Sequence, residues 1–308
     1  MIRGAISLAA MATVLFQAQQ EQIARFRSTG DAVRVDVLVS DRGRPVAGLQ
    51  AHDFELRDSG VIQAIEAVAI EDVPVTLMLA LDTSSSVSGQ LQQLKDAAQA
   101  AVASLRSDDH VALLTFSDRV VRAQTFTRDR RLLGAAIDRM TAAGGTSLRD
   151  VVYTATALRE RAPGRVVLLV FTDGVDTVSW LTPDDVLDAA VRSDMVMYAI
   201  STSDALYHPN AGTAERYAED AAKLFRAEPE LFPHGFIVEL TDRTGGSVLF
   251  VQKAIELPDA FSRIVAEFKS RYLLTYSPRG VPAVGWHPIE VRLKNRRGQA
   301  TARRGYWR

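Results

Sequence analysis

Two runs of the sequence are apolar at almost every position, and they constrain the fold more than any other feature. Residues 73–81 read VPVTLMLAL and residues 165–171 read RVVLLVF. A strand buried on one face alternates apolar and polar residues, whereas a strand covered by helices on both faces is apolar throughout. We therefore expect both runs to be central strands of a sheet that has helices on both faces.

The segments around these runs alternate between helix and strand patterns. Residues 89–105 place apolar side chains along one helical stripe, and residues 110–117 read as a strand. Further helices are expected at 129–140, 147–162, 183–193, 236–246 and 257–272, and further strands at 120–126, 195–201 and 247–251. Strands that alternate with helices favour an α/β fold with a doubly wound, mostly parallel six-stranded sheet.

Both ends of the chain follow a different pattern. Residues 33–39 place valine at every second position, which is the period of a half-buried strand, and residues 53–70 read as two short strands around a turn at 58–60. Residues 272–308 also alternate. Because each end segment is too small to fold alone, we expect them to pair as a small β-sandwich-like domain. The predicted organisation is a signal peptide at 1–18, an N-terminal β segment at 28–72, the α/β domain at 73–271 and C-terminal strands at 272–308.

The first residues have the pattern of a secretory signal. A short positive start, MIR, precedes thirteen apolar residues, GAISLAAMATVLF, and the sequence then turns polar, with Ala18 as the expected cleavage position. Thirteen residues are too few to cross a bilayer, which needs about twenty. We expect an exported product, periplasmic or secreted, with no membrane span after signal removal. The alternative is a buried N-terminal helix.

Composition excludes several classes of function. The net charge is −1, from 36 basic and 37 acidic residues, so no bulk field attracts nucleic acid. The chain has no cysteine, which removes thiol catalysis, disulfides and cysteine-bound zinc. The five histidines share no spacing typical of metal ligands.

Polar side chains follow both apolar runs. The first run ends in DTSSS at residues 82–86, and the second ends in TD at residues 172–173. Between them, Gly144 and Gly145 allow a tight loop that can bring Thr146 to the same place. Ligands of open parallel sheets bind beyond the carboxyl ends of the strands, so we expect these side chains to meet in one crevice.

These residues offer oxygen atoms and neither nitrogen nor sulfur as ligands. The predicted set is Asp82, Ser84, Ser86, Thr146 and Asp173. Such a set suits a hard cation, Mg²⁺, Mn²⁺ or Ca²⁺, rather than zinc. If the hydroxyls bind the ion directly and the carboxylates act through water, the ion keeps its attraction for an outside anion. Asp150 is a candidate for orienting the site, or a plain helix N-terminal carboxylate. The alternative for the whole set is ordinary turn and helix-cap residues.

Residues 73–271 resemble a von Willebrand factor type A domain with its metal-ion-dependent adhesion site. The family pattern D-x-S-x-S occurs here as DTSSS, its threonine loop as GGTSLRD and its second aspartate as FTDGVD. The resemblance implies that Ser84 and Ser86 bind the metal directly and that Thr146 does so mainly when a ligand is present. It also implies that Asp82 and Asp173 contact the metal through water molecules, and that a glutamate or aspartate of the ligand completes the coordination shell of the metal. The flanking DFELRDSG and ARRGYWR resemble a bacterial group of proteins related to this family.

The function predicted from these patterns is a divalent-cation-dependent protein-binding module, not an enzyme, whose partner presents Asp or Glu. One alternative is a metal-dependent hydrolase or phosphatase with Asp82 as the nucleophile. However, Thr83 and Ser84 stand where a D-x-D pattern would place a carboxylate, and G-x-S-x-G and P-loop motifs are absent. The other alternative is an envelope scaffold that a metal stabilises. Asp176 is expected to be a solvated turn residue, and Trp286 and Trp307 are expected to pack in the sandwich.

Overall fold

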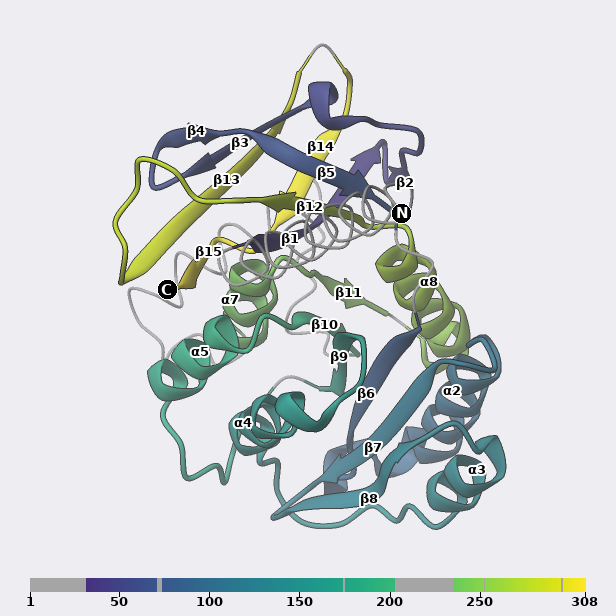
Figure 1. Ribbon diagram of the computed structural model, residues 1–308. Helices are drawn as coiled ribbons and strands as arrows, with labels where there is room; N and C mark the ends of the chain where they lie inside the picture. The colour runs from purple at the N-terminus through teal and green to yellow at the C-terminus, as the bar shows by residue number, and fades with distance from the viewer. Residues whose placement is uncertain (1–31, 71–73, 174, 203–234, 252, 295) are drawn as a thin grey trace, which may run out of the picture.

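The computed structural model describes residues 32–70, 74–173, 175–202, 235–251, 253–294 and 296–308 (Figure 1). The signal peptide predicted at 1–18 lies outside these residues, as do residues 203–234. None of the described helices is long and apolar enough to cross a bilayer.

A six-stranded sheet forms the centre of the α/β domain, as predicted. Its strand order is β11-β10-β9-β6-β7-β8, and only β8 runs antiparallel to its neighbour. The strands are β6 (Val75–Asp82), β7 (His110–Phe116), β8 (Val120–Thr127), β9 (Arg165–Thr172), β10 (Val196–Ser201) and β11 (Val248–Phe250). Every residue of β6 is buried, which explains why this run carries no polar alternation.

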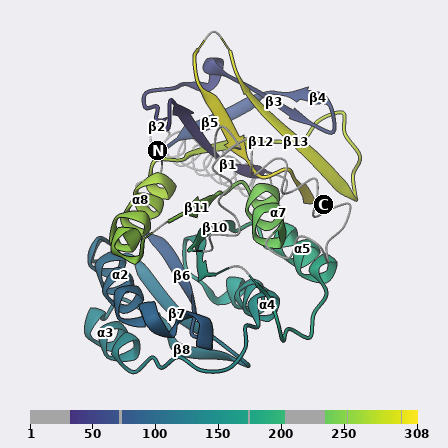
Figure 2. The ribbon, with the colours of Figure 1, turned by 180° about the vertical axis from the view of Figure 1, so that it is seen from behind.

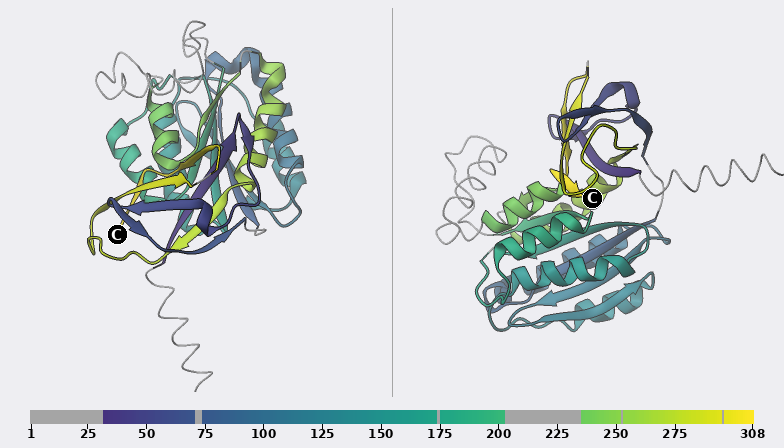
Figure 3. Two further views of the ribbon diagram at one scale, coloured as in Figure 1. Left: turned by 90° about the horizontal axis from the view of Figure 1, so that it is seen from above. Right: turned by 60° about the vertical axis from the view of Figure 1, so that its left-hand side comes forward.

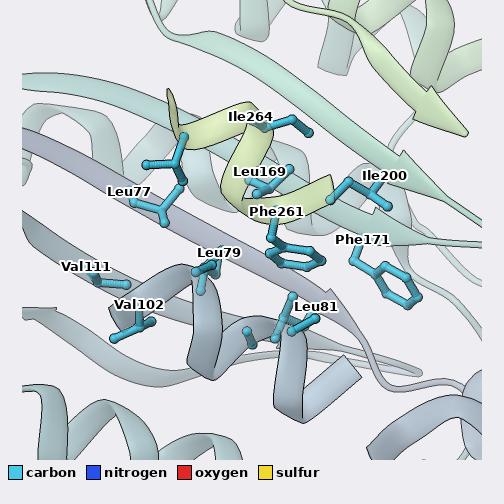
Figure 4. Close-up of a cluster of buried hydrophobic side chains, with 14 of the residues drawn as sticks. Leu77, Leu79, Leu81, Val102, Val111, Leu169, Phe171, Ile200, Phe261 and Ile264 are labelled. Atoms are coloured by element: carbon cyan, nitrogen blue, oxygen red, sulfur yellow. The ribbon is translucent and has the colours of Figure 1, made fainter. Parts of the chain in front are cut away.

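Helices cover both faces of this sheet (Figure 2). One face packs against α2 (Leu91–Ala103), α3 (Arg130–Asp138) and α8 (Leu257–Lys269), and the other against α4 (Leu148–Leu158), α5 (Pro183–Arg192) and α7 (Gly235–Thr244). Alternate residues of β6 point to opposite faces. Leu79 therefore packs with Phe261 of α8 (Figure 4), whereas Met78 packs with the α4 side. Short 3₁₀ helices are η1 (Ala51–Asp53), η2 (Ser85–Gln90), η3 (Arg159–Arg161) and η5 (Ala254–Glu256).

The two ends of the chain form two antiparallel sheets, as predicted. In one sheet the order is β14-β1-β12-β5, with β2 on β1, and in the other it is β15-β13-β3-β4. The strands are β1 (Val33–Asp41), β2 (Arg44–Pro45), β3 (Phe54–Asp58), β4 (Val61–Gln63), β5 (Ile65–Ala69), β12 (Tyr272–Tyr276), β13 (Trp286–Leu293), β14 (Gln299–Ala302) and β15 (Gly305–Trp307). Residues 54–70 hold three strands rather than two, because at Ala64 the chain passes from one sheet to the other.

The sandwich lies over one edge of the α/β sheet, the edge formed by the amino-terminal ends of the parallel strands (Figure 3). Arg165, the first residue of β9, forms an ion pair with Asp36 of β1. Fully buried Arg271 donates to Tyr198 Oη of β10 at 2.9 Å and to the Asp36 carbonyl at 3.1 Å. These contacts leave the opposite edge, where the parallel strands end, clear of the sandwich.

Asp109 is buried and links β6 to α8 through hydrogen bonds that we expect to be lost in acid. Its carboxylate accepts from Lys269 Nζ at 2.6 Å and from the backbone N–H groups of Val75 and Arg106, each at 2.9 Å. Burial raises the pKa of Asp109, but these hydrogen bonds outweigh it and hold the pKa below its ordinary value. A lowered folded-state pKa contributes stability that is present above the unfolded pKa and is lost as the pH falls through the folded value.

We therefore expect the free energy of unfolding to decline as the pH falls below about 4, the ordinary pKa of Asp. Urea unfolding between neutral and acidic pH measures this decline. Asp109→Asn should flatten it, and Asp96→Asn, on the exposed face of α2, is the control. If Asp109→Asn shows the same decline in the free energy of unfolding as the wild type, the contacts of Asp109 are not the cause of that decline.

Candidate metal centre

The candidate site lies at the carboxyl ends of β6 and β9, which are neighbours in the middle of the sheet. After β6 the chain continues to β7 and β8 on one side, and it later returns to β9 on the other side. Ligands of such sheets bind where the strand order reverses, which in this chain is between the loops that leave β6 and β9. Three loops meet here: the first at residues 82–86, the second at 141–147 and the third at 172–173 and 175–181.

In the first loop, Asp82 is held rigidly at the end of β6. Its side chain is fully buried, Oδ1 accepts from the Ser84 N–H at 2.8 Å and Oδ2 accepts from Thr172 Oγ1 at 2.9 Å. Ser84 has extended backbone angles, and η2 begins at the next residue. The turn into η2 places Ser86 Oγ 2.9 Å from Ser84 Oγ. The two serine oxygens therefore lie together next to a fixed carboxylate.

The second loop is joined to the first by backbone hydrogen bonds. The Ala143 N–H donates to the Thr83 carbonyl at 2.8 Å, and the Ser85 N–H donates to the Gly144 carbonyl at 3.0 Å. Gly144 has φ +82°, which strains any residue other than glycine, and a Cβ there would displace the Asp118 carboxylate. These contacts carry Thr146, which is buried, to the same edge of the sheet.

The third loop is joined to the second through Thr146 and Thr177. The Thr146 N–H donates to Thr177 Oγ1 at 2.8 Å, and the Thr146 carbonyl accepts from the N–H groups of Thr177 at 2.9 Å and Val178 at 3.2 Å. Asp173 directly follows Thr172, the residue that bonds to Asp82. The five predicted residues thus occupy three joined loops at one edge, and their role as metal ligands stays a prediction.

The electrostatics of this edge favour a cation. Burial raises the pKa of Asp82 to about 6, hydrogen bonds from Ser84 and Thr172 partly offset that rise, and the charge of Asp173 adds to it. A desolvated carboxylate beside a second negative charge is stabilised by a nearby positive ion. Among the described residues, no group of three or more His, Cys, Asp and Glu could hold a metal. The three loops offer hydroxyl and carboxylate oxygens, and such a donor set fits Mg²⁺, Mn²⁺ or Ca²⁺.

Two acidic residues shape the loops in ways that the sequence did not predict. Asp176 was expected in a solvated turn, and that expectation is wrong: its carboxylate accepts from the Arg149 N–H at 2.8 Å and from Arg149 Nη2 at 3.0 Å. Asp118 accepts from the Gly145 N–H at 2.6 Å. Neither aspartate belongs to a sequence motif that would predict its partner, which lies 27 residues away in the chain.

Asp150, the candidate for orienting the site, forms hydrogen bonds with the backbone of the third loop. Its carboxylate accepts from the N–H groups of Trp180 and Leu181 at 3.1 to 3.2 Å. These contacts are with the third loop rather than with the predicted ligands. Of the three described histidines, His52 and His287 belong to the sandwich and His110 begins β7, so none lies at this edge.

Comparison with known proteins identifies the domain that carries this site. Residues 77–175 match the family model of the von Willebrand factor type A domain. The chain therefore contains such a domain, as the resemblance indicated, and the matched stretch includes all five predicted ligands. A comparison with curated protein sequences gives no significant match.

Several solved structures are similar to this chain. A conserved hypothetical protein, BatB, from Bacteroides thetaiotaomicron is 18% identical, with a TM-score of 0.45, and the match covers 63% of this chain and 98% of that one. A von Willebrand factor type A protein from Catenulispora acidiphila is 13% identical, with a TM-score of 0.49, over 86% and 74%. The vWF domain of the type V pili tip protein Mfa5 from Porphyromonas gingivalis is 23% identical, with a TM-score of 0.33, over 34% and 39%.

Proposed function

We propose that the von Willebrand factor type A domain of this chain is a divalent-cation-dependent module that binds a protein partner through a carboxylate of that partner. Ser84, Ser86 and Thr146 would hold Mg²⁺, Mn²⁺ or Ca²⁺, and Asp82 and Asp173 would act through water. The observation that carries the proposal is the paired serine oxygens, 2.9 Å apart beside the fixed carboxylate of Asp82. We also propose that the product is exported, on the signal pattern at 1–18.

The hydrogen bonds of Asp82 support this division of roles. Both of its oxygens already accept from protein donors, so this carboxylate is suited to positioning the neighbouring hydroxyls rather than to binding the ion itself. Neutral hydroxyl ligands quench little of the ion's charge. When bound, the ion supplies an electrophilic centre that attracts an outside carboxylate.

An exposed tryptophan in the third loop supports protein binding. The side chain of Trp180 is 92% exposed, and Val178 in the same loop is also exposed. Asp150 fixes the Trp180 backbone, so the indole is presented by an ordered loop. Exposed tryptophans on preorganised surfaces are typical anchors of protein interfaces. This feature favours a binding module over a scaffold in which the metal only stabilises the fold.

The hydrolase alternative receives less support from the same residues. A nucleophilic carboxylate must reach its substrate, whereas Asp82 is fully buried with both oxygens bonded. No described histidine lies at this edge to serve as a general acid or base.

A capture experiment tests the proposal. The full chain is incubated with envelope extracts in Mg²⁺, in EDTA, and in EDTA followed by excess Mg²⁺. We expect one partner to be captured in Mg²⁺, lost in EDTA and recovered when Mg²⁺ returns. Metal-dependent turnover of generic phosphoesters would instead support the hydrolase. Metal uptake that affects neither capture nor turnover would support the scaffold.

Trp180→Ala should weaken binding of the captured partner about tenfold, because an exposed anchor side chain is lost. Mg²⁺ affinity should not change, since the indole contributes no ligand. Surface plasmon resonance and calorimetric titration measure the two quantities. Val284→Ala, which is 76% exposed in the sandwich, is the control. Equal partner affinity in the wild type and Trp180→Ala would exclude this surface from the interface.

A further inference from the structure

A cleft beside the first loop has a lining that suits an acidic side chain. It lies between β8 and the end of α3, and its volume is about 340 Å³. Val121 and Met140 supply apolar walls, and Arg119 and Arg139 are its charged lining residues. Among the residues that the structure describes, none that lines the cleft is acidic.

The cleft shares a wall with the candidate metal centre. Thr83 lines the cleft and directly follows Asp82. The Thr83 N–H donates to the Phe116 carbonyl, and its own carbonyl accepts from the Ala143 N–H, each at 2.8 Å. Ser117, also in the lining, accepts at its carbonyl from the Ser147 N–H at 2.9 Å. The cleft and the loops are therefore parts of one hydrogen-bonded unit.

The two guanidinium groups of the cleft are not neutralised by described carboxylates. Elsewhere in the domain, Arg106 and Arg159 form ion pairs with Asp108 and Asp194. Among the residues that the structure describes, no such pair involves Arg119 or Arg139, and both side chains are exposed. The neighbouring carboxylate of Asp118 is instead committed to the Gly145 N–H.

We propose that this cleft binds a second carboxylate of the same partner segment. The inference rests on the proposed function and narrows its partner to an acidic segment with two acidic residues. One carboxylate meets the cation at the first loop, and the other enters the cleft and pairs with Arg119 and Arg139. Guanidinium groups form charge-assisted hydrogen bonds with carboxylates, and the apolar walls accommodate the methylene groups of the acidic side chain.

A random peptide library selected against the full chain in Mg²⁺ tests this inference. The same selection is made with the Arg119→Gln/Arg139→Gln double variant and with Arg122→Gln. Arg122 is exposed on β8 between Val121 and Ala123, which line the cleft, and successive residues of a strand point to opposite faces. We expect the wild type and Arg122→Gln to enrich peptides with two acidic residues at a fixed spacing. The double variant should enrich peptides with one acidic residue.

Affinities of one selected peptide give a quantitative readout. Replacing its second acidic residue by the matching amide should weaken wild-type binding about fivefold and leave the double variant unaffected, as expected for a partly exposed ion pair. The difference in wild-type affinity between the acidic peptide and its amide-substituted form should become smaller at high salt. Calorimetry with Mg²⁺ alone checks that the double variant keeps the metal affinity of the wild type.

The outcomes separate the two proposals. Enrichment of single acidic residues by the wild type, or the same two-acid pattern in the double variant, would overturn the arginine cleft and leave cation-dependent binding intact. A selection that is the same in Mg²⁺ and in EDTA would overturn the proposed function and this inference with it.

Discussion

Asp82→Ala is expected to lower the affinity of the domain for Mg²⁺ about 100-fold, the upper end of what removal of a residue that orients metal ligands costs. The substitution removes the acceptor of two hydrogen bonds, from the Ser84 N–H and from Thr172 Oγ1. It also removes one of the two negative charges that stabilise a cation at this edge. The serine hydroxyls then lose both their fixed positions and their electrostatic support.

Calorimetric titration of Mg²⁺ into the wild type and the variant measures this loss. Asp82→Asn is the more informative second variant, because it keeps the shape of the side chain and removes its charge. Asp96→Ala, on the exposed face of α2, controls for a general charge effect. Far-ultraviolet circular dichroism confirms that each variant is folded. A folded Asp82→Ala protein that binds Mg²⁺ like the wild type would remove Asp82 from the site.

Asp58→Ala is expected to cost about 4 kcal/mol of stability, in the range for loss of one partner from a buried charged network. Asp58 Oδ2 accepts from the hydroxyls of Tyr276 and Tyr306, each at 2.8 Å. Oδ1 accepts from His287 Nδ1 at 2.8 Å and from Ser59 Oγ at 2.9 Å. Asp58 and His287 are fully buried, so the substitution leaves several donors without an acceptor and without water.

This network joins strands from both ends of the chain. Asp58 ends β3, and its partners lie on β12, β13 and β15. Burial raises the pKa of Asp58, but hydrogen bonds from Tyr276, His287 and Tyr306 outweigh it and hold the pKa below its ordinary value. Burial, together with the bond to Asp58, raises the pKa of Tyr306 to about 12. The carboxylate is thus held ionised, and the hydroxyls are held as donors.

Urea unfolding of Asp58→Ala, Tyr276→Phe and Tyr306→Phe measures the contribution of the network. Each phenylalanine variant should lose about 1 kcal/mol, since one donor is removed and the carboxylate keeps its other partners. Mg²⁺ affinity should be unchanged in the phenylalanine variants, because the sandwich lies at the edge of the α/β sheet opposite the site. A loss below about 1 kcal/mol for Asp58→Ala would contradict a network of this strength.

The parts of the fold that the sequence predicted are those set by local pattern. The unbroken apolar runs identified β6 and β9 as central strands because burial on both faces leaves no polar position. The valine alternation at residues 33–39 identified β1, because burial on one face leaves every second position apolar. The passage between sheets at Ala64 was missed, because β4 and β5 differ in their pairing partners rather than in their period.

In the candidate site too, local pattern predicted the position of some residues and not of others. Asp82 could be placed because it ends β6, Asp173 because it directly follows β9, and Thr146 because two glycines precede it. Asp118 and Asp176 could not be placed, since their partners Gly145 and Arg149 are 27 residues away and are brought near only by the assembled sheet. The same applies to Arg119 and Arg139, which no motif connects and which both line the cleft between β8 and α3.

Anomalous diffraction from crystals of the full chain grown with Mn²⁺ is the most direct test of the central claim. If the serines that follow β6 hold the ion, the manganese peak lies between Ser84 Oγ and Ser86 Oγ, and Ser84→Ala crystals lose it. A peak at some other place in the molecule, with these two hydroxyls bonded only to protein atoms, would contradict the account.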